Sequence, residues 1–228
     1  MSASNQSRTA VLGVGWVNAQ AWGGIRRGAS VAYAGLSDLR ALWRHAPLFA
    51  YPVKSIGRFD LASLATCYAV ALALRDAGVA YAEGRRQAIG LLGTDAEGAL
   101  AANRAYFTDY VRNGRTLGRG NLFIYTPPSS PLAEAAIHFG LSGPTLYVGA
   151  GATRRADALR IAGQWVEEGA CDAAVVVDRD AQAAAGWLLG AGPGLCALDE
   201  AAALAQAAAN VDDLVSRLTT RVTAGGSR

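Results

Sequence analysis

The stretch Gly140-Leu-Ser-Gly-Pro-Thr-Leu-Tyr-Val-Gly-Ala-Gly-Ala-Thr153 decides the fold, because an apolar run passes through a glycine-rich turn directly into a helix-forming segment. Leu146-Tyr-Val148 predicts the end of a buried strand, and Gly149-Ala-Gly-Ala152 predicts a tight elbow. In open α/β sheets a ligand or catalytic group lies where a strand's carboxyl end meets a helix, because that helix end presents unpaired N–H groups and a positive dipole end. An activated nucleophile would therefore stand near position 152, where this chain has alanine.

The helix after the elbow is predicted to be amphipathic. At about 100° per residue, one arc holds Ala158, Leu159, Ala162, Trp165, Val166 and Gly169, and the other holds Asp157, Arg160, Gln164, Glu167 and Glu168. Burying the second arc unpaired would cost about 1–3 kcal/mol for each neutral polar group and more for each charge. We therefore expect only the first arc to pack on a sheet, with no second sheet over the other.

Apolar periodicity predicts further elements on both sides of that stretch. Strands are predicted at 9–17, 86–94 and 173–177, with a short one in 194–199; helices are predicted at 98–113, 132–139 and 200–222, and one from Asp60, its N-cap, to Gly78. The segment 19–51 is predicted to be mostly irregular. We expect one domain over residues 9–222, a flexible N-terminus over 1–8 and a disordered tail over 223–228.

Composition excludes several classes of protein. The 228 residues are 52% hydrophobic and 17% charged, which suits a globular α/β domain with a substantial core. No long apolar window lacks charge and the N-terminus has no apolar core segment, so we expect neither a membrane span nor a signal peptide, and a cytoplasmic location. Cys67, Cys171 and Cys196 are widely spaced, which predicts buried thiols rather than a disulfide framework or a zinc site.

The net charge of +3 comes almost wholly from arginine, because Lys54 is the only lysine. No basic run carries interleaved aromatic residues, so nucleic acid is not an expected partner. A modest basic surface could meet an acidic carrier protein. His45 and His138 lie outside any catalytic pattern and are predicted to be structural.

Four segments together resemble the nucleophile region of β-ketoacyl synthases of the thiolase superfamily. They are Gly140-Leu-Ser-Gly-Pro-Thr-Leu-Tyr-Val148, the elbow, Ala156-Asp-Ala-Leu159 and Glu168-Gly-Ala-Cys-Asp-Ala-Ala-Val-Val-Val177. Arg58-Phe-Asp60, Asp76-Ala-Gly78 and the strand that ends in Gly93-Thr94 are also similar to that family. The resemblance implies a thiolase-like α/β fold with a mixed five-stranded sheet and helices on both faces, as a single N-terminal-type half whose second half is missing.

The resemblance also implies that this chain has no catalytic residue. Carried over without a gap, the family's cysteine falls on Ala152, and its following Ala-Ser falls on Thr153-Arg154. Decarboxylative condensation needs a thiolate and imidazoles that stabilise the developing oxyanions, and no such set is recognisable. The implied function is that of a chain-length-factor-like subunit, as in type II polyketide and aryl-polyene pathways. Such a subunit pairs with a full-length ketosynthase as a heterodimer, meets acyl carrier protein indirectly and uses no cofactor.

Two groups of residues take roles from the resemblance. The residues expected to line or gate an acyl tunnel are Phe107, Leu122, Phe123, Ser129, Gly151, Ala152 and Thr153. The residues expected to pair across the subunit interface are Ala173, Ala174, Val175, Val176 and Val177, because this apolar strand would be an aggregation-prone edge if left open.

Two other functions stay open on the sequence. A small α/β acyltransferase or hydrolase could use the Thr153 hydroxyl, although no Gly-x-Ser-x-Gly elbow or Ser/His/Asp set accompanies it. A nucleotide-binding regulatory module would use Gly13 and Gly15, although the third glycine of the dinucleotide fingerprint is absent.

Overall fold

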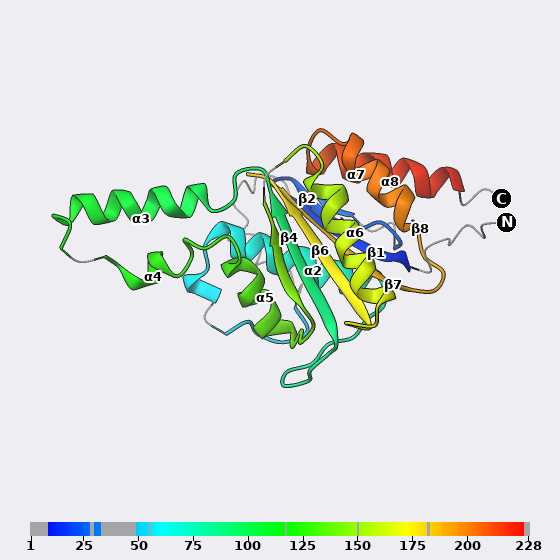
Figure 1. Cartoon of the computed structure of the whole chain (residues 1–228), viewed down its shortest axis with the longest axis horizontal. Coiled ribbons are helices and arrows are strands. Elements are labelled where there is room, and N and C mark those ends of the chain that lie inside the picture. The colour runs from blue at the N-terminus through cyan, green and yellow to red at the C-terminus, as the bar shows by residue number, and fades with distance from the viewer. Residues whose placement is uncertain are drawn as a thin grey trace.

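A computed structural model describes residues 9–27, 30–32, 49–54, 56–116, 118–149, 151–181 and 183–225. Its strands are β1 (Thr9–Asn18), β2 (Ala21–Gly24), β3 (Ser30–Ala32), β4 (Ile89–Asp95), β5 (Thr145–Val148), β6 (Ala173–Arg179), β7 (Ala183–Ala191) and β8 (Cys196–Ala197). Its helices are η1 (Ile56–Arg58), α2 (Leu61–Asp76), α3 (Leu100–Arg112), α4 (Gly120–Phe123), α5 (Ser130–Phe139), α6 (Arg154–Glu167), α7 (Leu198–Ala207) and α8 (Val211–Gly225). These elements form three layers, with one sheet between two layers of helices (Figure 1).

The sheet is mixed, as the sequence predicts. Its strand order is β3-β2-β1-β7-β6-β4-β5, with β8 paired to β1. Strand β4 runs parallel to β5 and β6, whereas β7 runs antiparallel to both β6 and β1. The strands predicted from the sequence correspond to β1, β4, β5, β6 and the short β8, and the described residues add β2, β3 and β7. The segment predicted to be irregular thus contains two strands.

Helices cover both faces of the sheet, which confirms the predicted layering. On one face α2 and α5 enclose a core that contains Phe59, Tyr68 and Phe139. On the other face α6, α7 and α8 enclose a core that contains Leu159, Trp187 and Leu214. The chain therefore buries apolar side chains on both sides of its central strands, and β4 is buried along its whole length.

Helix α2 is the central helix of its layer, and its burial explains the glycines of β1. Asp60 caps its N-terminus by accepting a hydrogen bond from the Ser63 N–H at 2.8 Å, as predicted. A Cβ on Gly15 would collide with the backbone of Leu72 and Ala73, and one on Gly13 would meet the Ala77 nitrogen at 2.5 Å. These glycines let the helix lie directly on the sheet and leave no space for a phosphate.

A buried carboxylate fixes the other end of α2. Asp76 accepts hydrogen bonds from the backbone N–H groups of Val14, Arg26 and Arg27 at 2.8–3.0 Å. It joins the C-terminal turn of α2 to β1 and to the chain after β2. The pattern Asp-Ala-Gly at the helix end therefore has a structural role in this protein.

The strand predicted to form the subunit interface is not an edge strand. Residues 173–177 lie in β6, which pairs with β4 on one side and with β7 on the other. Val175, Val176 and Val177 are at most 2% exposed. The interface expectation for Ala173, Ala174, Val175, Val176 and Val177 is therefore wrong, because the unrecognised strand β7 already satisfies the second side of β6.

One edge strand of the sheet is β5 instead. Among the described residues it pairs with β4 alone, and its first two residues, Thr145 and Leu146, are exposed. The prediction that this stretch ends a strand is correct, and the prediction that the strand is buried is wrong. Leu146 is 41% exposed.

The C-terminal region also differs from its prediction. The expected single helix over 200–222 is two helices, because the chain breaks between Ala207 and Val211. Helix α8 continues to Gly225, so residues 223–225 are helical and the predicted tail boundary at 223 is wrong. Residues 1–8 and 226–228 lie outside the described part. No helix among the described residues has the length and apolar character needed to cross a membrane.

Candidate functional site

The predicted elbow forms between β5 and α6. Strand β5 ends at Val148 and α6 begins at Arg154. The described residues between them, Gly149, Gly151, Ala152 and Thr153, are all exposed. A methyl group thus occupies the position at which the resemblance places a nucleophile. Thr153 is the N-cap residue, and its hydroxyl makes no capping hydrogen bond.

The elbow rests on a buried ion cluster that the sequence did not suggest. Arg155, at the start of α6, donates from Nε to Asp178 Oδ2 at 2.6 Å and from a terminal nitrogen to the Ala208 carbonyl at 2.6 Å. Arg154 lies 3.6 Å from the other oxygen of Asp178. The cluster ties together the N-terminus of α6, the end of β6 and the end of α7.

Two opposed effects act on the pKa of Asp178. Burial raises this pKa, Arg155 and Arg154 lower it, and burial prevails, so the pKa of Asp178 is raised to about 6. At neutral pH Asp178 is ionised and engaged by both guanidinium groups. Its carboxylate therefore serves to fix the elbow, and the residue is not a free base for Thr153.

The amphipathic pattern of α6 is largely confirmed. Ala158, Leu159 and Ala162 are buried, whereas Gly169, which lies beyond the helix end, is exposed. A Cβ on Gly163 would collide with Leu198, so α7 packs closely on α6 at this point. The polar arc remains at the surface, as expected.

A helical arm projects from the sheet between β4 and α5. It consists of α3, the following turn and α4, and it extends outward on the side of the sheet that ends in β5 (Figure 1). No residue of α3 is buried. Leu100, Phe107 and Val111 are 41%, 64% and 38% exposed, although they share one arc of the helix.

The expected gate residues lie on or beside this arm, which we define as residues 100–124. Phe107 is on α3, Leu122 and Phe123 are on α4, and exposed Ser129 precedes α5. The Phe123 ring lies 5.5 Å from the ring of Tyr106. Gly151, Ala152 and Thr153 lie on the body of the protein instead, so the tunnel residues named from the sequence form two separate groups within this chain.

A cavity of about 700 Å³ opens between α2 and the base of α3. It lies at the carboxyl ends of β4 and β6, where Asp95 and Arg179 form a buried ion pair at 3.2 Å. Alanines and prolines make up most of its wall, and Tyr125 closes one side. None of the seven expected tunnel residues lines this cavity. The clue in the sequence was the cluster of alanines on one arc of α3.

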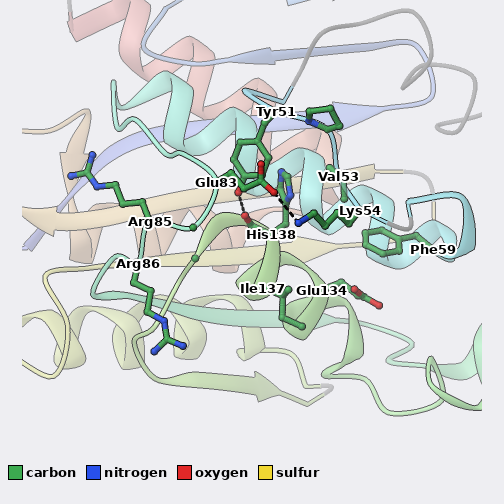
Figure 2. A pocket seen from close by; sticks show the side chains of 13 residues that line it. Tyr51, Val53, Lys54, Phe59, Glu83, Arg85, Arg86, Glu134, Ile137 and His138 are labelled. Carbon is green, nitrogen blue, oxygen red and sulfur yellow. Dashed lines mark hydrogen bonds and ion pairs between the residues drawn. The ribbon is translucent and has the colours of Figure 1, made fainter.

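A second cavity, of about 400 Å³, lies near His138 at the other end of the sheet (Figure 2). The His138 ring packs among Phe49, Tyr51, Tyr81 and Phe139, and its backbone carbonyl accepts a hydrogen bond from the Tyr51 hydroxyl. Burial lowers the pKa of His138. This packing supports a structural role.

His138 cannot act on the elbow. It lies on α5 before β5 begins, whereas the elbow follows the end of β5. The neighbouring strand β4 has seven residues, and at about 3.3 Å per residue the two ends of this strand are roughly 20 Å apart. His45 lies outside the described residues.

All three cysteines lie in the described part of the chain, and the sequence predicts buried thiols there rather than a zinc site. Cys67, Cys171 and Cys196 are free and buried, as predicted, and burial raises the pKa of Cys196 to about 11. No group of three or more His, Cys, Asp or Glu side chains in the described ranges could hold a metal ion.

The order β1-α2-β4-α5-β5-α6-β6-β7, with the sheet order given above, defines a thiolase-like α/β fold. No protein-family model matches the chain, and no curated protein matches its sequence. Solved structures of ketosynthases do match its fold. At the sequence identities involved, these likenesses establish the fold alone.

Three of these structures illustrate the likeness. A β-ketoacyl synthase from Burkholderia phymatum STM815 matches with a TM-score of 0.57 and 15% identity, over 82% of this chain and 59% of that one. A complex of the ketosynthase ApeO with its chain length factor ApeC from Xenorhabdus doucetiae matches with a TM-score of 0.54 and 13% identity, over 82% of this chain and 80% of that one. The AntDE:AntF complex, a type II polyketide synthase acyl-carrier protein with its ketosynthase, matches with a TM-score of 0.55 and 14% identity, over 82% of this chain and 59% of that one.

Proposed function

We propose that this chain is a non-catalytic, chain-length-factor-like subunit that pairs with an active ketosynthase in polyketide or aryl-polyene chain elongation. The observation that carries the proposal is Ala152, which stands exposed at the strand-to-helix elbow where a ketosynthase would present its cysteine. Solved structures of the same fold include a ketosynthase in complex with a chain length factor. Acyl groups would arrive on an acyl carrier protein docked mainly to the partner.

Two exposed features support a paired state. The β5 edge offers unpaired backbone groups to a partner strand, and such edges are normally covered or blunted. The arm exposes Phe107 and Phe123, which are 64% and 57% exposed. Both features lie on the same side of the sheet (Figure 1), so one partner can cover both. Such a contact replaces β6 with β5 as the proposed interface strand.

The charge of the arm indicates the kind of surface that it would meet. Residues 100–124 contain four arginines and one aspartate, a net charge of +3 that equals the net charge of the whole chain. Asp109 is already 3.4 Å from Arg119. The partner's facing surface is therefore expected to be acidic around an apolar centre.

We expect the purified chain to show no ketosynthase turnover and no acylation by an acyl-carrier or coenzyme A thioester. Restoring a thiol with Ala152→Cys is not expected to restore turnover, because the described histidine, His138, precedes β5 and lies at the opposite end of the strands from the elbow. Intact-protein mass spectrometry and a radiolabelled condensation assay measure the two effects. Stoichiometric acylation of Thr153, or turnover by the Ala152→Cys variant alone, would contradict the proposal.

We also expect the arm to limit product length in the reconstituted pair. If Leu122 and Phe123 close the end of the partner's acyl tunnel, cutting either to alanine removes volume and yields longer products by one or more extension units. Thr116→Ala, at an exposed position in the turn of the arm, is the matched control. Product masses by liquid chromatography give the readout, and identical product lengths for all variants would exclude the gate without excluding the pairing.

A further inference from the structure

The cavity between α2 and α3 has an unusual wall. In most amphipathic helices the large apolar residues face the protein core and the polar residues face water. Helix α3 departs from this arrangement. Ala101, Ala102 and Ala105 line the cavity, while Phe107, on another arc, is 64% exposed. The side of α3 that faces the body therefore fills very little space.

The space left open is large enough for a ligand. The cavity of about 700 Å³ falls within the ~300–1,000 Å³ of typical small-molecule sites. Part of its wall belongs to the packed interior, because the lining residues Ala65, Tyr125, Pro131 and Ala183 are buried. Leu61, on the first turn of α2, lines the cavity and is 52% exposed, which adds an apolar rim. An apolar chain would remove these surfaces from water.

The charges around the cavity select the polar end of that ligand. Asp60, Asp95, Glu97 and Asp180 line it, and Arg179 is the one cation among the lining residues that the structure describes. Arg179 is engaged by Asp95, Asp60 caps α2, and Asp180 accepts from the backbone of Ala183. The exposed carboxylate of Glu97 makes no hydrogen bond or ion pair with any residue that the structure describes. A carboxylate-bearing ligand would be repelled, whereas a cation would find an acceptor at Glu97.

We propose that this cavity binds an aliphatic chain that ends in a primary amine. The chain lies between the first turn of α2 and the alanine face of α3, and the ammonium group pairs with Glu97. The site belongs to this chain alone. It needs neither a partner subunit nor the elbow, so it goes beyond the pairing function proposed above.

Titration calorimetry with three ligands of equal chain length tests the proposal on the purified full chain. Octan-1-amine is expected to bind at least tenfold more tightly than octanoate and severalfold more tightly than octan-1-ol. Glu97→Gln is expected to lower the affinity for the amine to that for the alcohol. Ala105→Trp fills the cavity from the alanine face of α3 and is expected to abolish binding of all three.

Thr108→Trp is the matched control, because Thr108 is exposed on the same helix and does not line the cavity. Circular dichroism and thermal melting establish that each variant folds. Equal affinity for the three ligands, tighter binding of octanoate, no measurable binding of octan-1-amine, or equal effects of the two tryptophan variants would each overturn the proposal. These outcomes are separate from ketosynthase pairing, which is measured by co-purification.

Discussion

Changing Leu146 to lysine is expected to abolish the proposed association of this chain with a ketosynthase while leaving the chain folded. Leu146 is 41% exposed on β5, which pairs with β4 alone among the described residues. A lysine on an edge strand prevents another strand from adding to it, because the added pair would have to bury the charge. Affinity purification of the tagged chain from its native host, followed by native mass spectrometry, measures the loss. At least a tenfold fall in recovered ketosynthase is expected.

Ser216→Lys is the matched control for this change. Ser216 is an exposed residue of α8, which packs on the face of the sheet formed with α6 and α7. This variant is expected to retain its partner. Val176→Lys provides a contrast, because Val176 is 2% exposed within β6 and its substitution should unfold the chain rather than release a partner. A folded Leu146→Lys variant with undiminished ketosynthase would exclude the β5 interface.

Changing Arg155 to methionine is expected to lower the free energy of unfolding by about 3–5 kcal/mol at pH 7.5. The change leaves the buried carboxylate of Asp178 with Arg154, which lies farther away than Arg155 does. Methionine retains most of the side-chain volume, so the loss reports the charge and the hydrogen bond to Ala208. Arg160→Met is the control. Arg160 is 54% exposed and its pair with Asp157 is at the surface, so a change within about 0.5 kcal/mol is expected. Urea denaturation measures both.

The cost of Arg155→Met should also depend on pH. The folded-state pKa of Asp178, about 6, is already raised by burial, and losing Arg155 removes an influence that lowers it. Stability linked to a raised carboxyl pKa is present in acid and is lost as pH rises through that pKa. The deficit of the variant should therefore be smaller at pH 5 than at pH 7.5. Adding Asp178→Asn should recover part of the lost stability at pH 7.5. A stability deficit that is the same at both pH values and in the double variant would contradict this account.

Turn residues and helical periodicity in the sequence correctly predicted several individual elements of the fold. The elbow after Val148, the cap at Asp60 and the buried arc of α6 follow from turn residues and helical periodicity, and the structure confirms them. The thiolase-like layering was predicted from the family resemblance, because the helix and strand segments follow one another in that family's order. These predictions needed no knowledge of contacts between distant segments.

The interface prediction was wrong because one strand was not recognised. β7 has the sequence Ala-Ala-Ala-Gly-Trp-Leu-Leu-Gly-Ala, and alanine and glycine are poor strand formers. Its Gly186 is required because a Cβ there would meet the Ala69 carbonyl of α2 at 2.5 Å. The close packing of β7 against α2 therefore outweighs the low strand propensity of its alanines and glycines. Without β7, β6 had only one neighbour and was taken for an edge.

The ion cluster and the cavity could not be predicted from sequence spacing. Arg155 and Asp178 are 23 residues apart, and they meet only because α6 crosses back over β6. The cavity depends on which arc of α3 faces the body, and the helix carries alanines on one arc and large apolar residues on another. Amphipathic reasoning would have placed the large residues inside.

We propose that this chain pairs with a ketosynthase and carries no acyl group itself. Intact-protein mass spectrometry of the affinity-purified complex, after incubation with an acyl thioester, tests both parts in one measurement. The expected result is a 1:1 ratio of the two polypeptides, with the acyl mass increment on the ketosynthase and none on this chain. Acylation of this chain, or a stable monomer recovered without any ketosynthase, would contradict the account.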